Sequence, residues 1–550
     1  MIYRIVLLLL LAVTPCHAAI LVLSANGSYS QKATLSQAAA DADTAGKTVV
    51  VTSALTAVQS NISSATMHGW PADRTLRVVQ GGSIGNTTTL RIPGPFEAGR
   101  YAVFNGAGMV CLGYVPQIVR EWFPSTYDTT TLLQYAVDNW PMGSTVNLSP
   151  GLFSISGSGT AMINLTRNVS IKGSGSRGTT ISAVAPGGNT TTDGIRYAVT
   201  DNGGLMDVRN QSVSNLTLYM TNGRHAISGG DTGSGVLPHF QFTVRDCVFA
   251  AGSGYDLYLS DGFAFGIYEN NQFGSGVYLT NVADGQRVVF NQFTGQGTNP
   301  GLVMDCEAGT YSHIIQSNNF SNKNGAIYII NGSQVKILYN QMEQFGTNTG
   351  TYTAMVTVVG LGYPSHGIDI IGNNFGGGSN VNYNLRLISA YGTNIRDNVF
   401  HAALVDDIVT DSTSKWTRVG YNDSDGTATP VVSDSGVGSF GVNKTAASAV
   451  LNNSWVDSVG TFRFTKNSDG YVRFSGRLTG GILTSGTSPF NIPAGFKPLV
   501  DSDMIAPTVT GTVKLYVSAT TGQAIFYGGA APDATLFLDG IGYYAEQAVY

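Results

Sequence analysis

Short apolar runs alternate with polar turns along residues 245–400, and one phrase recurs among them. Each repeat closes on a Phe or Met, and an Asn stands two residues before that closing residue. Successive closing residues lie 20 to 33 positions apart. A period of this length indicates a solenoid in which each repeat adds one supersecondary unit. The Asn positions are Asn271, Asn291, Asn318, Asn340, Asn373 and Asn398, with Cys247 in the equivalent place one repeat earlier.

The apolar runs that precede the phrase are short and rich in Val and Ile, as at 287–290, 313–315 and 367–371. Such runs are too short for helices and indicate buried parallel strands. Asn tolerates a left-handed bend, and its amide can hydrogen-bond to the Asn one coil away. The pattern predicts an all-β, right-handed parallel β-helix with an Asn ladder at one corner and Phe and Met stacked inside. A leucine-rich solenoid is the nearest alternative, but its Leu-x-x-Leu-x-Leu frame is absent.

Two helices are expected before these coils. Thr34 is the predicted N-cap of the first, with Gln37 completing a capping box. The second covers residues 127–140, where Leu133, Val137 and Trp140 share one helical face. We expect this second helix to cover the open end of the β-helix, because an uncovered end would expose strand edges.

Changes in composition predict the domain organisation. A signal peptide at 1–18 is followed by a mixed β and helical region at 19–115 and by the β-helix at 116–410. Residues 411–450 are rich in Ser, Thr and Gly and predict a linker. Residues 451–550 alternate apolar and polar positions in the manner of antiparallel strands, which predicts a small C-terminal β-sandwich.

Composition and charge limit the kinds of molecule that the protein is expected to bind. The net charge is −5 with no basic run, so nucleic acid is not an expected partner. The apolar core of the N-terminal segment is short and ends in small residues, which is typical of a secretory signal cleaved after Ala18 and too short for a membrane span. We therefore expect a secreted protein. The remaining cysteines and the seven His have no disulfide or zinc spacing, and no cofactor is expected.

The segments at 74–104, 120–155 and 169–181, followed by the Asn-x-Phe coils, resemble the pectate-lyase superfamily. The resemblance is to the branch found in phage tailspikes and secreted polysaccharide depolymerases, and it covers roughly residues 34–410. The family often has Glu-Trp-Trp-Gly-Ala where this chain has Glu-Trp-Phe-Pro-Ser at 121–125. The resemblance implies a polysaccharide partner, a homotrimer, and a place either outside the cell or on a phage virion tail. Residues 490–498 and 538–544 also resemble distal domains of phage tail proteins.

Aligning the coils on their closing residues separates ordinary acids from unusual ones. Asp261 and Asp284 precede Gly in a repeated turn, so their expected role is structural. Asp305 occupies the same column but is followed by Cys306 and Glu307, and an extended chain would direct both acids to one face. Two neighbouring carboxylates can hold an acid and a base together. Glu343 is also unusual, because Gly, Thr, Ser or His stands directly after the other closing residues of the phrase. Asp305, Glu307 and Glu343 are the predicted catalytic residues, with exposed structural acids as the alternative.

Aromatic side chains on the coils are candidates for stacking on sugar rings. We predict that Tyr278, Tyr311 and Tyr328 bind substrate, together with Glu269, whose place in the repeat Arg245 and Arg396 share. Most tyrosines in a solenoid are core residues or half-buried. The candidates from which these were chosen also include Tyr255, Tyr258, Tyr268 and Tyr339.

Three functions fit this pattern. The first is a glycoside hydrolase that depolymerises a bacterial surface or extracellular polysaccharide. The second is a tail-fibre, spike or adhesin that binds glycans without cleaving them. The third is a polysaccharide lyase, which ranks below the hydrolase because Arg and Lys are sparse in the coils and no acid cluster suggests a Ca²⁺ site. Opposed carboxylates in one groove would favour the hydrolase, whereas isolated acids on different faces would favour binding alone.

Overall fold

The chain forms two compact units, Met1–Gly254 and Tyr255–Tyr550. The computed structural model describes residues 20–23, 29–41, 48–52, 54–55, 75–85, 89–92, 94–105, 108–201, 208–230, 238–294, 299–306, 311–321, 325–343, 354–376, 381–401, 403, 405–425, 432–436, 439, 444–447, 451–457, 462–466, 471–481, 484–492, 496–509, 511–527, 535–539 and 541–544. The predicted signal peptide lies outside the described residues.

The N-terminal part already pairs its strands in parallel. β3 (Thr48–Val51), β5 (Thr75–Val78) and β8 (Phe96–Ala98) form a parallel series, and β1 (Ile20–Leu23) and β2 (Tyr29–Lys32) add antiparallel strands at its edge. Two further parallel pairs join β4 (Ala54–Leu55) to β6 (Ser83–Ile84) and β7 (Leu90–Ile92) to β9 (Val110–Leu112). Parallel pairing therefore begins well before residue 116, where we expected the β-helix to start.

Both predicted helices are present. α2 (Leu35–Asp41) begins after Thr34, whose Oγ1 accepts from the Gln37 backbone N–H, while the Gln37 side chain accepts from Ala33. α4 (Thr130–Asn139) buries Leu133, Val137 and the following Trp140. It contacts β9 on one side and β12 (Ala161–Arg167) on the other. α4 thus packs between strands and does not close an open end, because parallel strands also precede it.

In each unit the coils build three parallel ladders, which we call first, second and third in the order that the chain visits them. In Met1–Gly254, the first ladder is β10 (Thr145–Asn147), β13 (Ser170–Lys172), β17 (Ser212–Ser214) and β21 (Thr243–Arg245); the second is β11 (Gly151–Ser156), β14 (Thr179–Val184), β18 (Thr217–Thr221) and β22 (Val248–Ala250); and the third is β12, β15 (Asp193–Asp201) and β19 (Ile227–Gly229).

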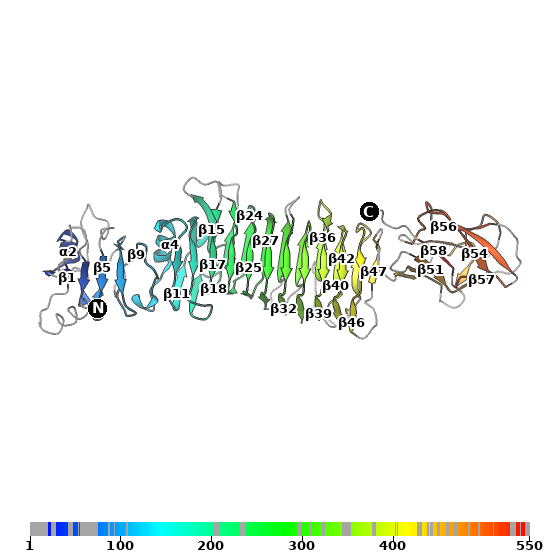
Figure 1. The fold of residues 1–550 in the computed structure, drawn as a ribbon. Coiled ribbons are helices and arrows are strands. Elements are labelled where there is room, and N and C mark those ends of the chain that lie inside the picture. The colour runs from blue at the N-terminus through cyan, green and yellow to red at the C-terminus, as the bar shows by residue number, and fades with distance from the viewer. Residues whose placement is uncertain are drawn as a thin grey trace. The chain divides into compact units, whose positions relative to one another are not determined.

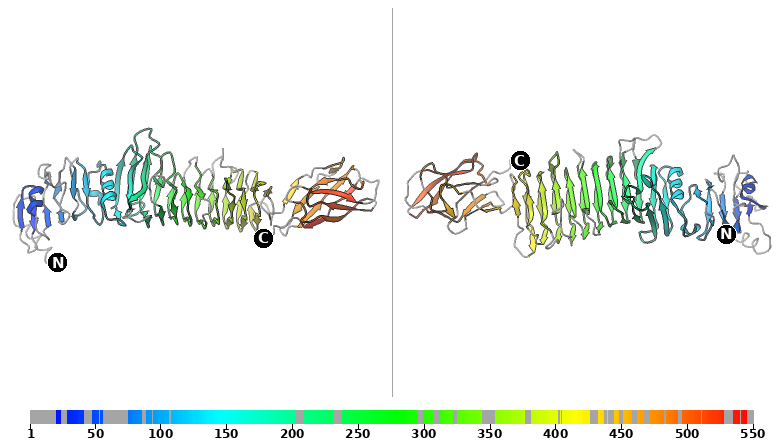
Figure 2. Two further views of the ribbon diagram at one scale, coloured as in Figure 1. Left: turned by 90° about the horizontal axis from the view of Figure 1, so that it is seen from above. Right: turned by 180° about the vertical axis from the view of Figure 1, so that it is seen from behind.

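The same pattern continues in Tyr255–Tyr550 (Figures 1 and 2). The first ladder is β25 (Ile267–Glu269), β28 (Arg287–Val289), β31 (Ile314–Gln316), β34 (Lys336–Leu338), β38 (Asp369–Ile371), β42 (Asn394–Arg396) and β45 (Arg418–Val419). The second is β26 (Gln272–Phe273), β29 (Gln292–Phe293), β32 (Asn319–Ser321), β35 (Gln341–Glu343), β39 (Asn374–Gly376), β43 (Val399–His401) and β46 (Asp423–Asp425). The third is β23 (Leu257–Ser260), β27 (Val277–Val282), β30 (Leu302–Cys306), β33 (Ile327–Ile330), β36 (Ala354–Val359), β40 (Tyr383–Ile388), β44 (Asp406–Thr410) and β47 (Val432–Asp434). The predicted right-handed parallel β-helix is confirmed.

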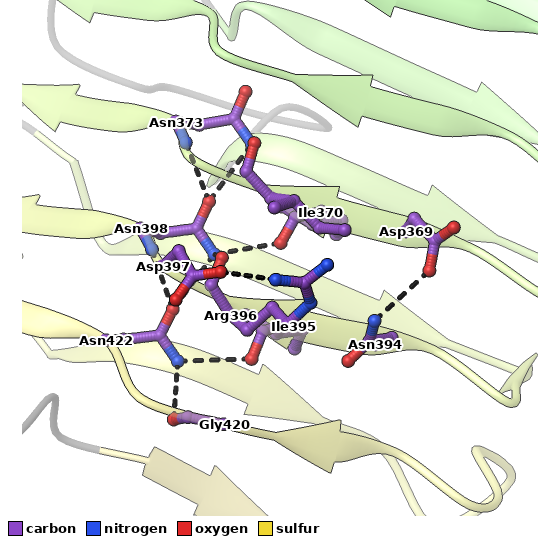
Figure 3. Close-up of polar contacts among 11 residues, drawn as sticks. Asp369, Ile370, Asn373, Asn394, Ile395, Arg396, Asp397, Asn398, Gly420 and Asn422 are labelled. Atoms are coloured by element: carbon purple, nitrogen blue, oxygen red, sulfur yellow. Dashed lines mark hydrogen bonds and ion pairs between the residues drawn. The ribbon is translucent and has the colours of Figure 1, made fainter.

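The Asn column is the predicted ladder. From Asn271 to Asn398, the backbone N–H and the side-chain Nδ2 of each Asn both donate to the side-chain oxygen of the Asn in the next coil, at 2.9–3.0 Å. Asn373, Asn398 and Asn422 show this stacking directly (Figure 3). The left-handed bend lies one residue before the Asn, for example at Phe290 and Tyr339. The Asn itself is therefore an amide that bridges coils, while its neighbour takes the turn.

The closing residues stack inside, as predicted. The rings of Phe293 and Phe320 lie 4.4 Å apart with nearly parallel planes, and those of Phe375 and Phe400 lie 4.7 Å apart. All four are fully buried. This apolar column next to a saturated amide column explains why the coil register is fixed, since a slip would bury amides without partners.

The coils extend past residue 410, into the segment that we expected to be a linker. β45, β46 and β47 pair in parallel with β42, β43 and β44. Asn422 takes the ladder position and accepts from Asn398. The motif was missed because Ser424 replaces the apolar closing residue.

The C-terminal strands pair antiparallel, as predicted for residues 451–550, although the first of them begins at Lys444. The sheets are β48 (Lys444–Ala447), β50 (Arg463–Lys466), β51 (Tyr471–Ser475) and β58 (Gly542–Tyr544); β49 (Val456–Asp457), β52 (Arg477–Thr479) and β57 (Thr535–Phe537); and β53 (Phe490–Asn491), β56 (Gln523–Tyr527), β55 (Thr512–Val517) and β54 (Ser502–Pro507). An aromatic core that includes Phe464, Phe474 and Phe490 joins them.

Candidate functional site

The outward side chains of the third ladder between β23 and β40 form the candidate site, here called the third-ladder face. Strand alternation directs Leu257, Leu259 and their equivalents inward, where they are fully buried. The residues between them point outward and are half-buried in β23 and β27. Because the strands are in parallel register, outward residues of successive coils form columns along the face.

One column carries aromatic and basic side chains. Tyr258 pairs with Tyr278, and the column continues through Val303, Tyr328 and Thr357 to Arg386. The rings of Tyr258 and Tyr278 lie 5.4 Å apart in a T-shaped arrangement, and Tyr255 adds a third ring 5.2 Å from Tyr278.

The small residues of this column are sheltered by the large ones. Val303 and Thr357 point outward, yet each is only 3% exposed. Tyr328 lies between them in register, and both Arg386 and Tyr278 are near enough to change its pKa electrostatically. Every residue of β36 is buried, although alternate residues point out of the coil. The face therefore has a covered floor flanked by tyrosine and arginine side chains.

Asp305 stands in the adjoining column, next to Thr280 on one side and Ile330 on the other. It is half-buried, while Cys306 after it faces the core. Burial raises the pKa of Asp305, and a hydrogen bond from Thr280 opposes this effect. A carboxyl group with a raised pKa is suited to proton transfer.

Burial also raises the pKa of Tyr328, an effect that nearby Arg386 opposes and nearby Tyr278 reinforces. A tyrosine whose pKa lies above its ordinary value stays protonated at neutral pH. Tyr328 can therefore donate a hydrogen bond or a proton, but it is a poor base.

The other predicted acids do not gather on this face. Glu343 ends β35 on the second ladder, in register with Ser321 and Gly376, and accepts from the Gln341 side chain. Glu269 ends β25 on the first ladder, beside Val289. Glu307 lies outside the described residues. The described part of the chain thus contains no opposed pair formed by Asp305 with Glu343 or Glu269.

The predicted tyrosines divide between two places. Tyr278 and Tyr328 join Asp305 on the third-ladder face, whereas Tyr311 lies at the corner that leads into β31 and is 47% exposed. Tyr268 is a core residue whose hydroxyl donates to Gln286 at 3.0 Å. Sequence reasoning missed Arg386, because its alignment with Tyr328 depends on the register of β36 across the longest repeat interval.

Neither a metal centre nor a membrane helix is found in the parts of the chain that the structure describes. There, no three His, Cys, Asp or Glu side chains come together in a group that could hold a metal ion. No described helix has the length and apolar character needed to cross a membrane.

No protein-family model matches the chain, and a search of curated proteins also finds no match. Solved structures are similar to it. The A-module of a mannuronan C-5 epimerase from Azotobacter vinelandii is 16% identical, with a TM-score of 0.39 over 54% of this chain and 84% of that chain. The enzymatically active domain of tailspike protein 2 from bacteriophage CBA120 is 12% identical, with a TM-score of 0.35 over 74% and 68%. ORF18 of Geobacillus virus E2 is 11% identical, with a TM-score of 0.31 over 76% of each chain.

These identities and TM-scores are too low to carry an activity from one protein to the other. The strand pairing of this chain itself confirms the fold that the resemblance to the pectate-lyase superfamily implied. The chain is a right-handed parallel β-helix protein.

Proposed function

We propose that the protein binds a polysaccharide along the third-ladder face and depolymerises it there. The observation that carries the proposal is the column from Tyr258 through Tyr278 and Tyr328 to Arg386, with Asp305 beside it. Tyrosine rings provide flat apolar surface for sugar rings, and their hydroxyls provide hydrogen bonds. A carboxyl group with a raised pKa beside such a surface provides proton transfer.

Hydrolysis is the reaction that we propose first. Protonated Asp305 would donate its proton to the bridging oxygen as the bond from that oxygen to the anomeric carbon breaks. A water molecule would then add its hydroxyl to the anomeric carbon and give its proton to a second carboxylate, proposed to be Glu307. An extended chain would place residues two apart at about 6.6 Å along the strand, near the lower end of the separation in inverting glycosidases.

Elimination is the second candidate, and Arg386 is the observation that favours it. A guanidinium group can pair with the carboxylate of an acidic sugar. Arg386 stands three coils from Asp305, about 14 Å of rise, so it would hold an acidic sugar next to the one that reacts. Asp305 would take a C–H proton from the reacting sugar, and Tyr328 would protonate the leaving oxygen as its bond to carbon breaks. The raised pKa of Tyr328 suits a donor and argues against a role as the base.

Binding without cleavage is favoured by one observation, the placement of Glu343 and Asp305 on different ladders.

Secretion or a place on a phage tail, and assembly as a homotrimer, remain predictions. Light scattering after size exclusion would give the number of chains.

The test is to incubate the purified protein with a panel of bacterial capsular and extracellular polysaccharides. Reducing ends report both reactions, and the ultraviolet absorbance of an unsaturated sugar reports elimination alone. We expect release from at least one substrate and at least a hundredfold loss in Asp305→Asn. The matched control is Asp369→Asn, a half-buried carboxylate on the first ladder that accepts from Asn394 (Figure 3).

The results separate the candidates. Binding to a polysaccharide with no product would leave the spike or adhesin function. Product release that is equal in wild type, Asp305→Asn and Asp369→Asn would overturn the assignment of the third-ladder face.

A further inference from the structure

A hollow of about 460 Å³ lies at a different place, the corner between the third ladder and the first ladder of the next coil. Three consecutive coils line it. The first contributes Tyr311, the second Asn331 and Gln334, and the third Tyr363 and His366. The coil order follows from the backbone, because Gln334 N–H donates to His366 and Lys336 N–H donates to His313, just beyond Tyr311. We call this place the corner hollow.

Two tyrosine rings stand on either side of the polar coil. Tyr311 is 47% exposed and Tyr363 is 61% exposed, so both offer ring surface to solvent. They belong to coils two steps apart, which corresponds to about 10 Å of rise along the β-helix. The rings of Tyr311 and Tyr363 therefore flank the turn that carries Asn331 and Gln334.

The turns that carry these side chains are held by hydrogen bonds. Tyr311 N–H donates to Asp284 at 2.6 Å, and Leu361 N–H donates to the side-chain oxygen of Asn331 at 2.7 Å. His366 N–H donates to Gly332 at 2.7 Å. A site whose backbone is fixed before binding loses less entropy when it takes a ligand.

The polar groups of the corner hollow suit hydroxyl groups. The Gln334 side-chain amide and the Nδ2 of Asn331 have no hydrogen-bond partner among the residues that the structure describes. An amide can both donate to and accept from a sugar hydroxyl. Of the described lining residues, none is Asp, Glu, Lys or Arg. The corner hollow therefore differs from the third-ladder face, which carries Asp305 and Arg386.

Aromatic side chains continue along the same corner in the following coils. His366 and Tyr391 are in ring contact at 5.5 Å, and Tyr391 and Trp416 at 5.9 Å. Trp416 is 44% exposed. A polymer whose units repeat along the β-helix could contact several of these rings, whereas a small metabolite would use only the corner hollow.

We propose that the corner hollow and the row of His366, Tyr391 and Trp416 form a second carbohydrate site that binds a polysaccharide through a neutral sugar residue in the hollow. The charged group on the row is Lys415, whose Nζ lies 5.1 Å from the centre of the Tyr391 ring. One sugar residue lies between Tyr311 and Tyr363, with its hydroxyls on the Asn331 and Gln334 amides. This site does not depend on cleavage at the third-ladder face. Tyr311, predicted from the sequence to bind substrate, belongs to this second site.

The experiment is affinity electrophoresis of the full chain through gels that contain one polysaccharide each. Dextran, galactomannan and arabinogalactan are the neutral probes, and alginate and polygalacturonate are the acidic probes. An Asp305→Asn background prevents cleavage during the run. We expect retardation by at least one neutral probe, and at least tenfold weaker binding when Tyr311→Ala and Tyr363→Ala are combined.

Two controls make the test specific. The Tyr311→Phe, Tyr363→Phe pair keeps the rings and should bind within about threefold of the parent. Tyr421→Ala removes a ring that is 81% exposed next to the ladder residue Asn422, at another corner, and should change nothing. The proposal is overturned if no neutral probe retards the parent, or if the double Ala variant binds equally well. It is also overturned if that variant changes the oligomeric state in light scattering, because the rings would then form an interface between copies of the chain.

Discussion

Replacing Asn373 by Ala removes one rung of the amide ladder and tests its energetic role. Asn373 is 1% exposed, and its side-chain oxygen accepts the backbone N–H and one side-chain N–H of Asn340, at 2.9 and 3.0 Å. Its Nδ2 donates to Asn398 at 3.0 Å (Figure 3). It also donates to Ile337 at 2.9 Å.

The magnitude follows from the groups left without partners. Two buried donors of Asn340 lose their acceptor, and each such loss costs about 1–3 kcal/mol. The expected destabilisation is about 2–6 kcal/mol. Because a solenoid coil contacts mainly its neighbours, the loss should be local to the coils around β35 and β39.

Hydrogen exchange followed by mass spectrometry measures this locally. Each 1.4 kcal/mol is a tenfold change, so exchange in peptides that cover β35 and β39 should accelerate by roughly 30-fold to roughly 20,000-fold. The matched control is Asn374→Ala. Asn374 is the next residue, its side chain is exposed, and its backbone N–H still donates to Asn340. We expect less than about a threefold effect there. Equal exchange in the two variants would refute the ladder as a source of stability.

Three further changes test individual groups. Asp305→Asn should abolish activity yet leave the chain at least as stable as wild type at pH 7. Burial raises the pKa of Asp305 above its ordinary value of 3.8, so the stability that its protonated form contributes is present at low pH and is lost as the pH rises through the raised pKa. A variant that is less stable than wild type in urea at pH 7 would contradict this argument. Burial lowers the pKa of His313 to about 4, so the unfolded chain takes up the proton first as the pH falls from 6.5 to 4, and His313 should account for about 3 kcal/mol of the stability that wild type loses over this range. In urea unfolding at the two pH values, His313→Gln should lose about 3 kcal/mol less than wild type, and an equal loss would disprove the assignment. Arg120→Lys should lower the free energy of unfolding, measured by thermal unfolding, by about 2–4 kcal/mol. The reason is that the buried guanidinium donates hydrogen bonds to the carbonyls of Leu152, Phe123, Pro124 and Ser125. The control Arg100→Lys, at an exposed position, should be neutral, and an equal effect of the two substitutions would count against a special role for Arg120.

The fold was predictable because its determinants repeat in the sequence. A buried Asn needs an amide partner, and a regular spacing supplies one in the next coil, so the spacing predicted the bonds. The prediction failed where a residue of the repeated phrase is replaced, as after Asn422, where Ser424 stands in place of the closing Phe. It also placed the left-handed bend on the Asn, whereas Phe290 and Tyr339 show that the preceding residue takes it. An exposed side chain before the Asn carries no strong pattern, because solvent accepts almost any residue there.

The site was less predictable, because the sequence marks unusual residues but not which surface they share. Asp305 and Glu343 stand out equally in the repeat, yet they lie on different ladders. Tyr278, Tyr328 and Arg386 look unrelated along the chain and become one column only through the registers of β27, β33, β36 and β40. Coil lengths vary by up to 13 residues, so counting from the Asn column cannot supply those registers.

The two proposed carbohydrate surfaces differ because they use different parts of the same coils. On the third-ladder face, strand register fixes the side chains at one spacing per coil, and burial raises the pKa values of Asp305 and Tyr328. Desolvated titratable groups favour chemistry. At the corner hollow, turns of variable length present exposed rings and neutral amides, which favour binding. An enzyme that must stay on a long polymer between cleavage events gains from this combination. Loss of the Tyr311 and Tyr363 rings should therefore slow the degradation of long chains while leaving short oligosaccharides unaffected, and equal slowing of both would place the two surfaces in one site.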